Sequence, residues 1–166
     1  MKPHADQEKI SVKIAIITVS DTRTPETDKS GMIIKELLQE AGHQISYYTI
    51  IKDEPDQIIN QLQNLTNNHA IDAIIYHGGT GIAPRDTTYD ALEKMLTKTL
   101  PGFGEIFRYL SYQEIGTRAI ATRSVAGIYQ NKLIFSIPGS SNAVQLATAK
   151  IIIPEITHLV KQLGLY

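Results

Sequence analysis

The segment at residues 12–19 reads VKIAIITV, and this nearly continuous run of apolar and β-branched residues constrains the fold most. A strand with one face in water alternates apolar and polar residues, whereas a strand covered on both faces is apolar throughout. The run therefore predicts a central strand of a sheet that carries helices on both sides.

Helical and strand patterns alternate after this run. Residues 34–41 place apolar side chains at i, i+3, i+4 and i+7, the spacing of an amphipathic helix. Residues 45–51 read as a strand, Pro55 opens a second helix, and residues 71–76 read as a third strand. Strands and helices alternating at such short spacings imply right-handed crossovers. We therefore predict an α/β fold, a three-layer α/β/α arrangement with a mostly parallel sheet.

The second half of the chain adds further elements. We predict a helix over residues 88–97 and a β-hairpin whose strands are residues 126–128 and 133–137. The last helix is predicted to begin at Pro154, because proline is favoured in the first turn of a helix. Residues 101–111 carry an apolar face of Ile106, Phe107 and Leu110 that a small domain does not readily cover, and we predict a subunit contact there.

Length and composition set the outer bounds. With 166 residues, 42% hydrophobic and 20% charged, the chain suits one compact domain. Residues 1–10 are mostly polar and are predicted to be a flexible N-terminus, which leaves residues 11–166 as the single domain. There is no signal-peptide core, and no apolar run approaches the roughly 20 residues that a membrane helix needs. We therefore expect a cytoplasmic protein.

The charge balance and the missing cysteines exclude several functions. The formal net charge is −1, and no block of like charge interrupts the chain, which argues against nucleic acid or a membrane surface as a partner. There is no cysteine, so disulfides, thiolate metal sites and cysteine nucleophiles are excluded. The histidines show no metal-binding spacing.

Residues 77–88 read HGGTGIAPRDTT and follow a strand directly. Gly78, Gly79 and Gly81 lack a Cβ, so their backbone N–H groups can converge on an anion beside the Thr80 hydroxyl. Asp86 follows closely and is a suitable ligand for Mg²⁺ shared with phosphate. The loop matches neither a Walker motif nor a dinucleotide fingerprint. It indicates a phosphorylated ligand, with a purely structural turn as the alternative.

Ligands of open α/β sheets bind beyond the carboxyl ends of the strands. The residues that follow the predicted strands include Ser20 and Asp21, then Asp53, and then the glycine loop with Asp86. Three carboxylates are thus expected to converge on one edge. Asp53 stands before Glu-Pro and equally suits a helix cap, and Asp21 and Asp28 equally suit turns or caps.

A second strand-to-helix junction lies at residues 138–142, where PGSSN brings hydroxyl groups to the start of a helix. It is either an anion site or an ordinary N-cap. Arg85 and Arg123 are either phosphate ligands or surface ion-pair partners. His77 is interpreted as a strand-end histidine that bonds to backbone, with contact to a substrate as the alternative.

Four motifs carry a resemblance to a known family. These are GGTG with the RD at residues 85–86, PGFGE at 101–105, TRSVAG at 122–127, and IPGS at 137–140. The chain resembles the MoaB/MogA family of molybdenum cofactor biosynthesis, which is related to the G domains of gephyrin type. The resemblance extends from about Val12 to the last helix, and residues 102–119 are most similar to the bacterial MoaB branch.

The resemblance implies a protein that binds molybdopterin as substrate and, in active members, transfers AMP from Mg²⁺·ATP to its terminal phosphate. Asp53 and Asp86 match family aspartates implicated in Mg²⁺·ATP chemistry, and they are the predicted catalytic and metal-binding residues. Ser111 and Thr122 match hydroxyls associated with the pterin site. The full predicted binding set is Ser20, Asp21, Gly78, Gly79, Thr80, Gly81, Ser111, Thr122, Arg123, Ser124, Pro138, Gly139 and Ser140.

Two roles stay open within the same family. The chain is either a molybdopterin adenylyltransferase or a non-catalytic molybdopterin-binding or carrier protein of the same pathway. The resemblance also implies self-association as a homohexamer or homotrimer, with other molybdenum cofactor enzymes as further partners.

Overall fold

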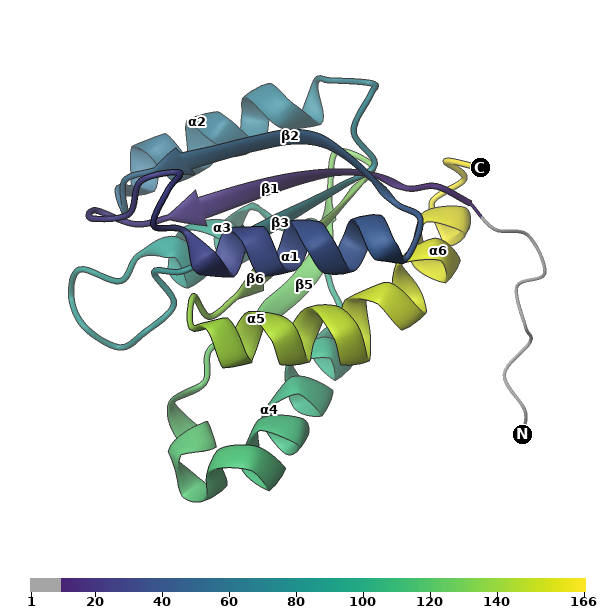
Figure 1. Ribbon diagram of the computed structural model, residues 1–166. Coiled ribbons are helices and arrows are strands. Elements are labelled where there is room, and N and C mark those ends of the chain that lie inside the picture. Colours follow the sequence, from purple (N-terminus) through teal and green to yellow (C-terminus); the bar gives the residue numbers. More distant parts are fainter. Residues whose placement is uncertain (1–9) are drawn as a thin grey trace.

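The strands form one six-stranded sheet in the order β2-β1-β3-β6-β5-β4, flanked by helices (Figure 1). The structure is a computed structural model, and it describes residues 10–166. The predicted flexible N-terminus therefore lies outside the described residues, apart from Ile10. The strands are β1 (Lys13–Val19), β2 (Gln44–Ile51), β3 (Ala73–His77), β4 (Lys98–Thr99), β5 (Val125–Tyr129) and β6 (Lys132–Ile137).

The sheet is mostly parallel, as predicted. β2, β1, β3 and β6 run parallel, whereas β5 pairs antiparallel with β6, and β4 pairs antiparallel with β5. The predicted hairpin is confirmed and is longer than expected. Its turn holds Gln130 and Asn131, both at positive φ, and Asn is among the residues that tolerate that conformation.

Helices cover both faces of the sheet. They are α1 (Lys29–Glu40), α2 (Pro55–Thr66), α3 (Thr88–Met95), α4 (Pro101–Ile115), the 3₁₀ helix η1 (Gly116–Ala121), α5 (Ser141–Ala147), the π-helical segment η2 (Thr148–Ile152) and α6 (Ile153–Gln162). Residues of α1, α4, α5 and α6 share one hydrophobic core, and residues of α2 and α3 share a second.

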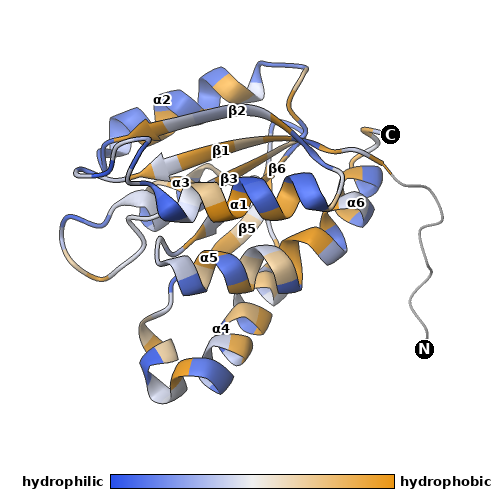
Figure 2. Ribbon diagram, in the orientation of Figure 1, coloured by the Kyte–Doolittle hydropathy of each residue, from blue (hydrophilic) through white to orange (hydrophobic). Residues whose placement is uncertain are grey.

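β1 is an interior strand, between β2 and β3, and both of its faces are apolar. Ile14 and Ile16 enter the core under α1, while Ala15 and Ile17 enter the core under α2. All four are fully buried. Figure 2 shows β1 as mostly hydrophobic, between helices on which hydrophobic and hydrophilic residues alternate. The nearly continuous apolar run in the sequence therefore reflects a strand covered on both sides.

The last helix, α6, begins at Ile153, one residue before the predicted start at Pro154, but it continues an earlier helix, which the sequence pattern did not predict. α5, η2 and α6 form one continuous 22-residue helix, Ser141–Gln162. Proline has no N–H to bond to the carbonyl four residues back. The π-helical segment precedes it, and the Ile153 amide bonds to the Thr148 carbonyl, five residues back.

The helix Ser141–Gln162 is long and apolar enough, by length and composition, to cross a membrane. That test is also passed by core helices of soluble proteins, and 44% of the apolar window is buried within the fold. Val144, Ile152, Ile156 and Val160 are fully buried in the core. The apolar character of this helix is thus used in packing against the sheet.

The order in which strands are added to the sheet reverses after β2. β2 lies on one side of β1 and β3 on the other, which creates a switch point between β1 and β3. Thr18 of β1 is in register with His77 of β3, which is in register with Ile137 of β6. Three strands therefore end at one edge, and the segments that follow them meet there.

Candidate functional site

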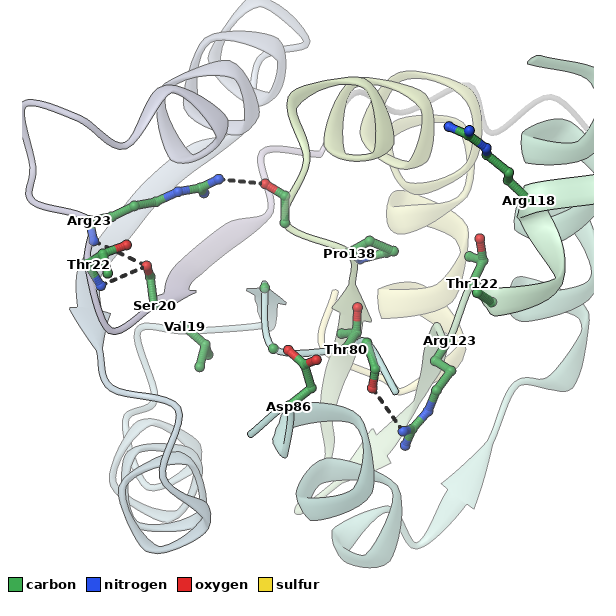
Figure 3. Close-up of a pocket in the computed structure, with 15 residues that line it drawn as sticks. Val19, Ser20, Thr22, Arg23, Thr80, Asp86, Arg118, Thr122, Arg123 and Pro138 are labelled. Carbon is green, nitrogen blue, oxygen red and sulfur yellow. Dashed lines mark hydrogen bonds between the residues drawn. The ribbon is translucent and has the colours of Figure 1, made fainter. Parts of the chain in front are cut away.

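A cleft of about 530 Å³ lies at this edge of the sheet, the place where open α/β sheets bind ligands (Figure 3). Its volume is in the range of small-molecule sites. The strand-end rule applied to the sequence therefore located the cleft. The predicted residues that line it are Ser20, Gly78, Gly79, Thr80, Gly81, Asp86, Thr122, Arg123, Pro138 and Gly139.

The glycine loop approaches its neighbours too closely for side chains. Gly78 and Gly79 have φ angles of 96° and 64°, which other residues rarely adopt. A Cβ on Gly79 would collide with the carboxylate of Asp53 and the hydroxyl of Thr88. A Cβ on Gly81 would lie against the carboxylate of Asp86. The glycines thus let the backbone lie directly beside two carboxylates, which is how the loop forms one wall of the cleft.

Asp53 is buried, with 5% of its surface exposed, and it lies beside the glycine loop without lining the cleft itself. Its Oδ1 accepts hydrogen bonds from the Thr87 amide at 3.0 Å and the Thr87 hydroxyl at 2.6 Å. The N-cap of α2 is Glu54. The helix-cap alternative for Asp53 is therefore wrong, and its carboxylate instead bonds the segment that carries Asp86.

Burial raises the pKa of Asp53 above its ordinary value, and the nearby charges of Asp86 and Asp21 raise it further, although the bonds from Thr87 oppose this. The three predicted carboxylates are therefore close enough to interact. Within residues 10–166, however, no three His, Asp or Glu side chains are grouped to hold a metal ion by themselves.

The oxygen atoms at the glycine loop fit Mg²⁺ bound together with phosphate. Mg²⁺ usually takes one or two carboxylates and completes its shell with water and substrate phosphates. Asp53, beside Gly79, and Asp86, beside Gly81, are the two carboxylates that would hold such an ion. The Thr88 hydroxyl is buried there without a hydrogen-bond partner.

The arginines of the sequence prediction take different roles. Arg85 forms ion pairs with Asp21 and Glu54, each at 2.8 Å, so the ion-pair interpretation holds for it. Asp21 also accepts a bond from the Asp53 amide at 3.2 Å, and it does not line the cleft. Arg123 also forms an ion pair, with Asp90, but unlike Arg85 it lines the cleft, and it donates to the Gly81 carbonyl at 3.1 Å.

The N-cap interpretation of the junction at residues 138–142 is confirmed, and the anion site stays a prediction. The Ser140 hydroxyl caps α5 by accepting from the Ala143 amide at 3.2 Å, and Ser140 does not line the cleft. Pro138 and Gly139 do line it. The Gly139 carbonyl accepts a hydrogen bond from the Arg23 guanidinium at 3.0 Å, and Arg23 lines the same cleft.

Two further predicted residues lie apart from the cleft. Ser111 is buried in α4, 5% exposed, and is not among the residues that line it. Ser124 is also buried, and it lines a separate small cavity of about 210 Å³. Its Oγ has no hydrogen-bond partner. Helical and strand periodicity do not report such side-chain directions, which are set by packing.

His77 does not line the cleft. The predicted hydrogen bond from its ring to the backbone is also wrong. His77 is fully buried, and its Nε2 lies 2.7 Å from the Thr18 hydroxyl. That hydroxyl donates to Asp28, which is also fully buried and caps α1. Burial lowers the pKa of His77 to about 4, so the ring is neutral at pH 7.

Sequence reasoning missed two arginines of the cleft, Arg23 and Arg118. Arg23 follows the first strand closely, so the strand-end rule had the means to find it. Arg118 lies in η1, which follows α4. No motif or strand end marks that position, and only the packing of η1 brings it to the cleft.

Comparisons with known proteins agree with this geometry. Residues 15–158 match the family described as a probable molybdopterin binding domain. The chain is 51% identical over 164 residues to molybdenum cofactor biosynthesis protein B of Halalkalibacterium halodurans, covering 98% of this chain and 96% of that protein. It is 48% identical to the Bacillus subtilis protein of the same name, with the same coverage of both chains.

Solved structures of proteins with related names are similar to this chain. A crystal structure of molybdenum cofactor biosynthesis protein B superposes with a TM-score of 0.93 at 44% identity, covering 95% of this chain and 99% of that one. The tungsten cofactor synthesizing protein MoaB from Pyrococcus furiosus has a TM-score of 0.82 at 35% identity, covering 93% and 98%. The family match and these identities together show that the chain belongs to the MoaB/MogA family of molybdenum cofactor biosynthesis proteins, and that it carries the molybdopterin-binding domain of that family.

Proposed function

We propose that this protein binds molybdopterin and transfers AMP from Mg²⁺·ATP to the terminal phosphate of the pterin, releasing pyrophosphate. The observation that carries the proposal is the meeting of three strand ends in one cleft, where an open glycine loop lies between Asp53 and Asp86. Such a cleft offers N–H groups to phosphates and carboxylates to a hard cation.

The reaction needs no protein nucleophile. A phosphate oxygen of the pterin attacks the α-phosphorus of ATP, one P–O bond forms, and the bond from the α-phosphorus to the bridging oxygen of pyrophosphate breaks. The attacking group is already an anion, so the protein has to align the two phosphates and compensate their charge. The absence of cysteine is consistent with this chemistry.

Each part of the cleft has a distinct task in this scheme. Asp53 and Asp86 would hold the magnesium ion, which supplies positive charge to the phosphates of the nucleotide. The backbone of residues 78–81 orients the phosphates, while Pro138 and Gly139 form the adjoining wall of the nucleotide site. Thr122 lies across the cleft from Ser20 and Thr22, and the resemblance assigns the pterin to Thr122 (Figure 3).

Asp86→Asn tests the transfer. Asp86 accepts a bond from the Ala83 amide at 3.2 Å, and the amide oxygen of asparagine can still accept it, so the loop is retained. We expect pyrophosphate release from Mg²⁺·ATP and molybdopterin to fall at least about 100-fold, in the range of a lost charge-stabilising group. Asp56→Asn, on the exposed first turn of α2, is the matched control and should be fully active. Unchanged turnover in Asp86→Asn would refute the scheme.

A second function, molybdopterin binding without turnover, is favoured by one observation. Asp53 is covered by Thr87 and does not line the cleft. Of the two proposed metal ligands, only Asp86 therefore faces the cleft. A carrier protein would bind molybdopterin tightly and release no pyrophosphate in the same assay. The wild-type result therefore separates the two functions.

We further propose that residues 11–166 act as one molybdopterin-binding domain, in the cytoplasm, and that the protein assembles as a homohexamer or homotrimer. The support for assembly is an apolar surface on α4 and η1. The predicted contact residues are partly wrong, because Phe107 is buried in the core, at 1% exposure. The exposed apolar residues of this surface are Ile106, Tyr109, Tyr112, Ile115 and Ile120.

A further inference from the structure

Three arginines line the cleft, against a single lining carboxylate, Asp86. Two of the three are held by the fold. Arg23 donates to Asp28 at 3.3 Å and to the Gly139 carbonyl at 3.0 Å. Arg123 pairs with Asp90 at 2.5 Å. Both guanidinium groups therefore have partners that compensate their charge or fix their direction.

Arg118 is different. It is exposed, and within residues 10–166 it has no hydrogen bond or ion pair. Figure 3 shows it on the same wall as Thr122, reaching toward the cleft from η1, across from Arg23. The cleft therefore contains one arginine whose charge the described part of the chain leaves uncompensated, and this arginine is available to a ligand.

The two ends of the cleft suit different phosphates. The glycine loop is flanked by Asp53 and Asp86, which attract a phosphate only together with a metal ion. A phosphate that carries no metal is repelled by these carboxylates and needs a cation of its own. A guanidinium offers two parallel N–H groups to such an oxyanion. Arg118 provides that cation on the wall away from the glycine loop.

We infer that Arg118 is a specificity-determining residue that binds the terminal phosphate of molybdopterin and holds it against the nucleotide. This inference rests on the proposed binding of molybdopterin and Mg²⁺·ATP in one cleft. It assigns the phosphate of the nucleotide to the glycine loop and the phosphate of the pterin to Arg118. It predicts that Arg118 discriminates phosphorylated from dephosphorylated pterin.

The test compares Arg118→Ala with wild type by equilibrium binding, which requires no turnover. A charge-assisted hydrogen bond to phosphate is worth at least about tenfold in affinity, so molybdopterin binding should weaken by that factor or more. Binding of dephosphorylated molybdopterin and of Mg²⁺ with a non-hydrolysable ATP analogue should change less than about twofold. Arg118→Lys should restore part of the lost affinity, because lysine keeps the charge without the fork.

Lys98→Ala removes an exposed cation from β4, outside the cleft, and serves as the control for net charge. Unchanged molybdopterin affinity in Arg118→Ala, or equal weakening for the dephosphorylated pterin, would overturn the inference. Weakened binding of the ATP analogue alone would assign Arg118 to the nucleotide and also overturn it. A wild-type protein that binds molybdopterin without releasing pyrophosphate would overturn only the transfer reaction, whereas one that binds no molybdopterin would overturn both.

Discussion

At the scale of single residues, Asp53 links the stability of the fold to the chemistry of the cleft. Its carboxyl is buried, and its pKa is raised above the ordinary value of 3.8. As pH rises from 3.8 through the raised pKa, the unfolded chain loses this proton first, so the folded state binds more protons. The contribution of Asp53 to stability is therefore present below 3.8 and is lost as pH rises through the raised pKa.

Asp53→Asn should remove this pH dependence. The asparagine oxygen can still accept the bonds from Thr87, while no charge is buried. We expect the variant to have a Tm in metal-free buffer at pH 7 equal to or above that of wild type, and to lose the stabilisation that Mg²⁺ and ATP confer on wild type. Thermal unfolding at several pH values, with and without Mg²⁺·ATP, measures both effects. A clear drop in Tm in metal-free buffer would show that Asp53 is needed for structure.

The same carboxyl predicts how Mg²⁺ binding depends on pH. A metal binds the ionised form, so protonation competes with it. The affinity for Mg²⁺ in the presence of ATP should therefore fall as pH is lowered through the raised pKa of Asp53. In Asp53→Asn this dependence should become weaker, because only Asp86 and the ATP phosphates still compete for protons, and calorimetric titrations that show the same dependence as wild type would contradict the assignment.

Gly79 has a positive φ and also lines the cleft. Gly79→Ala is unfavourable for two reasons. The φ of Gly79 is 64°, which alanine rarely adopts, and a Cβ at this position would collide with Asp53 and Thr88. We expect a loss of about 1 kcal/mol or more in the free energy of unfolding and weaker nucleotide binding. Gly102→Ala, in the first turn of α4 with open space at its Cβ, is the control. Chemical denaturation of both variants measures the difference, and equal stabilities would contradict the strain at Gly79.

At the scale of elements, the start of α5 is built by a cap. The Ser140 hydroxyl accepts from the Ala143 amide, so Ser140→Ala should cost about 1 kcal/mol in the free energy of unfolding. Because Ser140 does not line the cleft, nucleotide affinity should stay within about twofold of wild type. Urea denaturation and calorimetry test the two expectations, and a large loss of affinity at unchanged stability would place the hydroxyl in the site.

At the scale of the whole molecule, the exposed apolar surface of α4 and η1 should set the assembly. Ile120 is 90% exposed and Tyr109 is 63% exposed, values that a buried interface would remove. We expect wild type to be oligomeric and the double variant Tyr109→Glu, Ile120→Glu to be monomeric, as measured by multi-angle light scattering. Ile82→Glu, at another highly exposed position, is the matched control. An unchanged mass in the double variant would rule out this surface as the contact.

Much of the fold and part of the site follow from the sequence. The apolar run at residues 12–19 identified the central strand, and the glycine loop identified one wall of the cleft, because both depend on local residue types. The roles of Ser140 and His77 required side-chain directions, which depend on residues distant in the chain. The start of α6 was predicted to within one residue, but the sequence pattern did not show that a π-helical segment joins α6 to α5.

The sequence by itself determined the α/β layers, the mostly parallel sheet and the strand ends at the cleft. These features depend on the periodicity and glycine content of short segments of the chain. Only the tertiary structure decided which polar groups meet. It placed Asp53 against Thr87, tied Arg85 to Asp21, and brought Arg118 from η1 to the cleft. These pairings join segments far apart along the chain, and they are set by how the helices pack on the sheet.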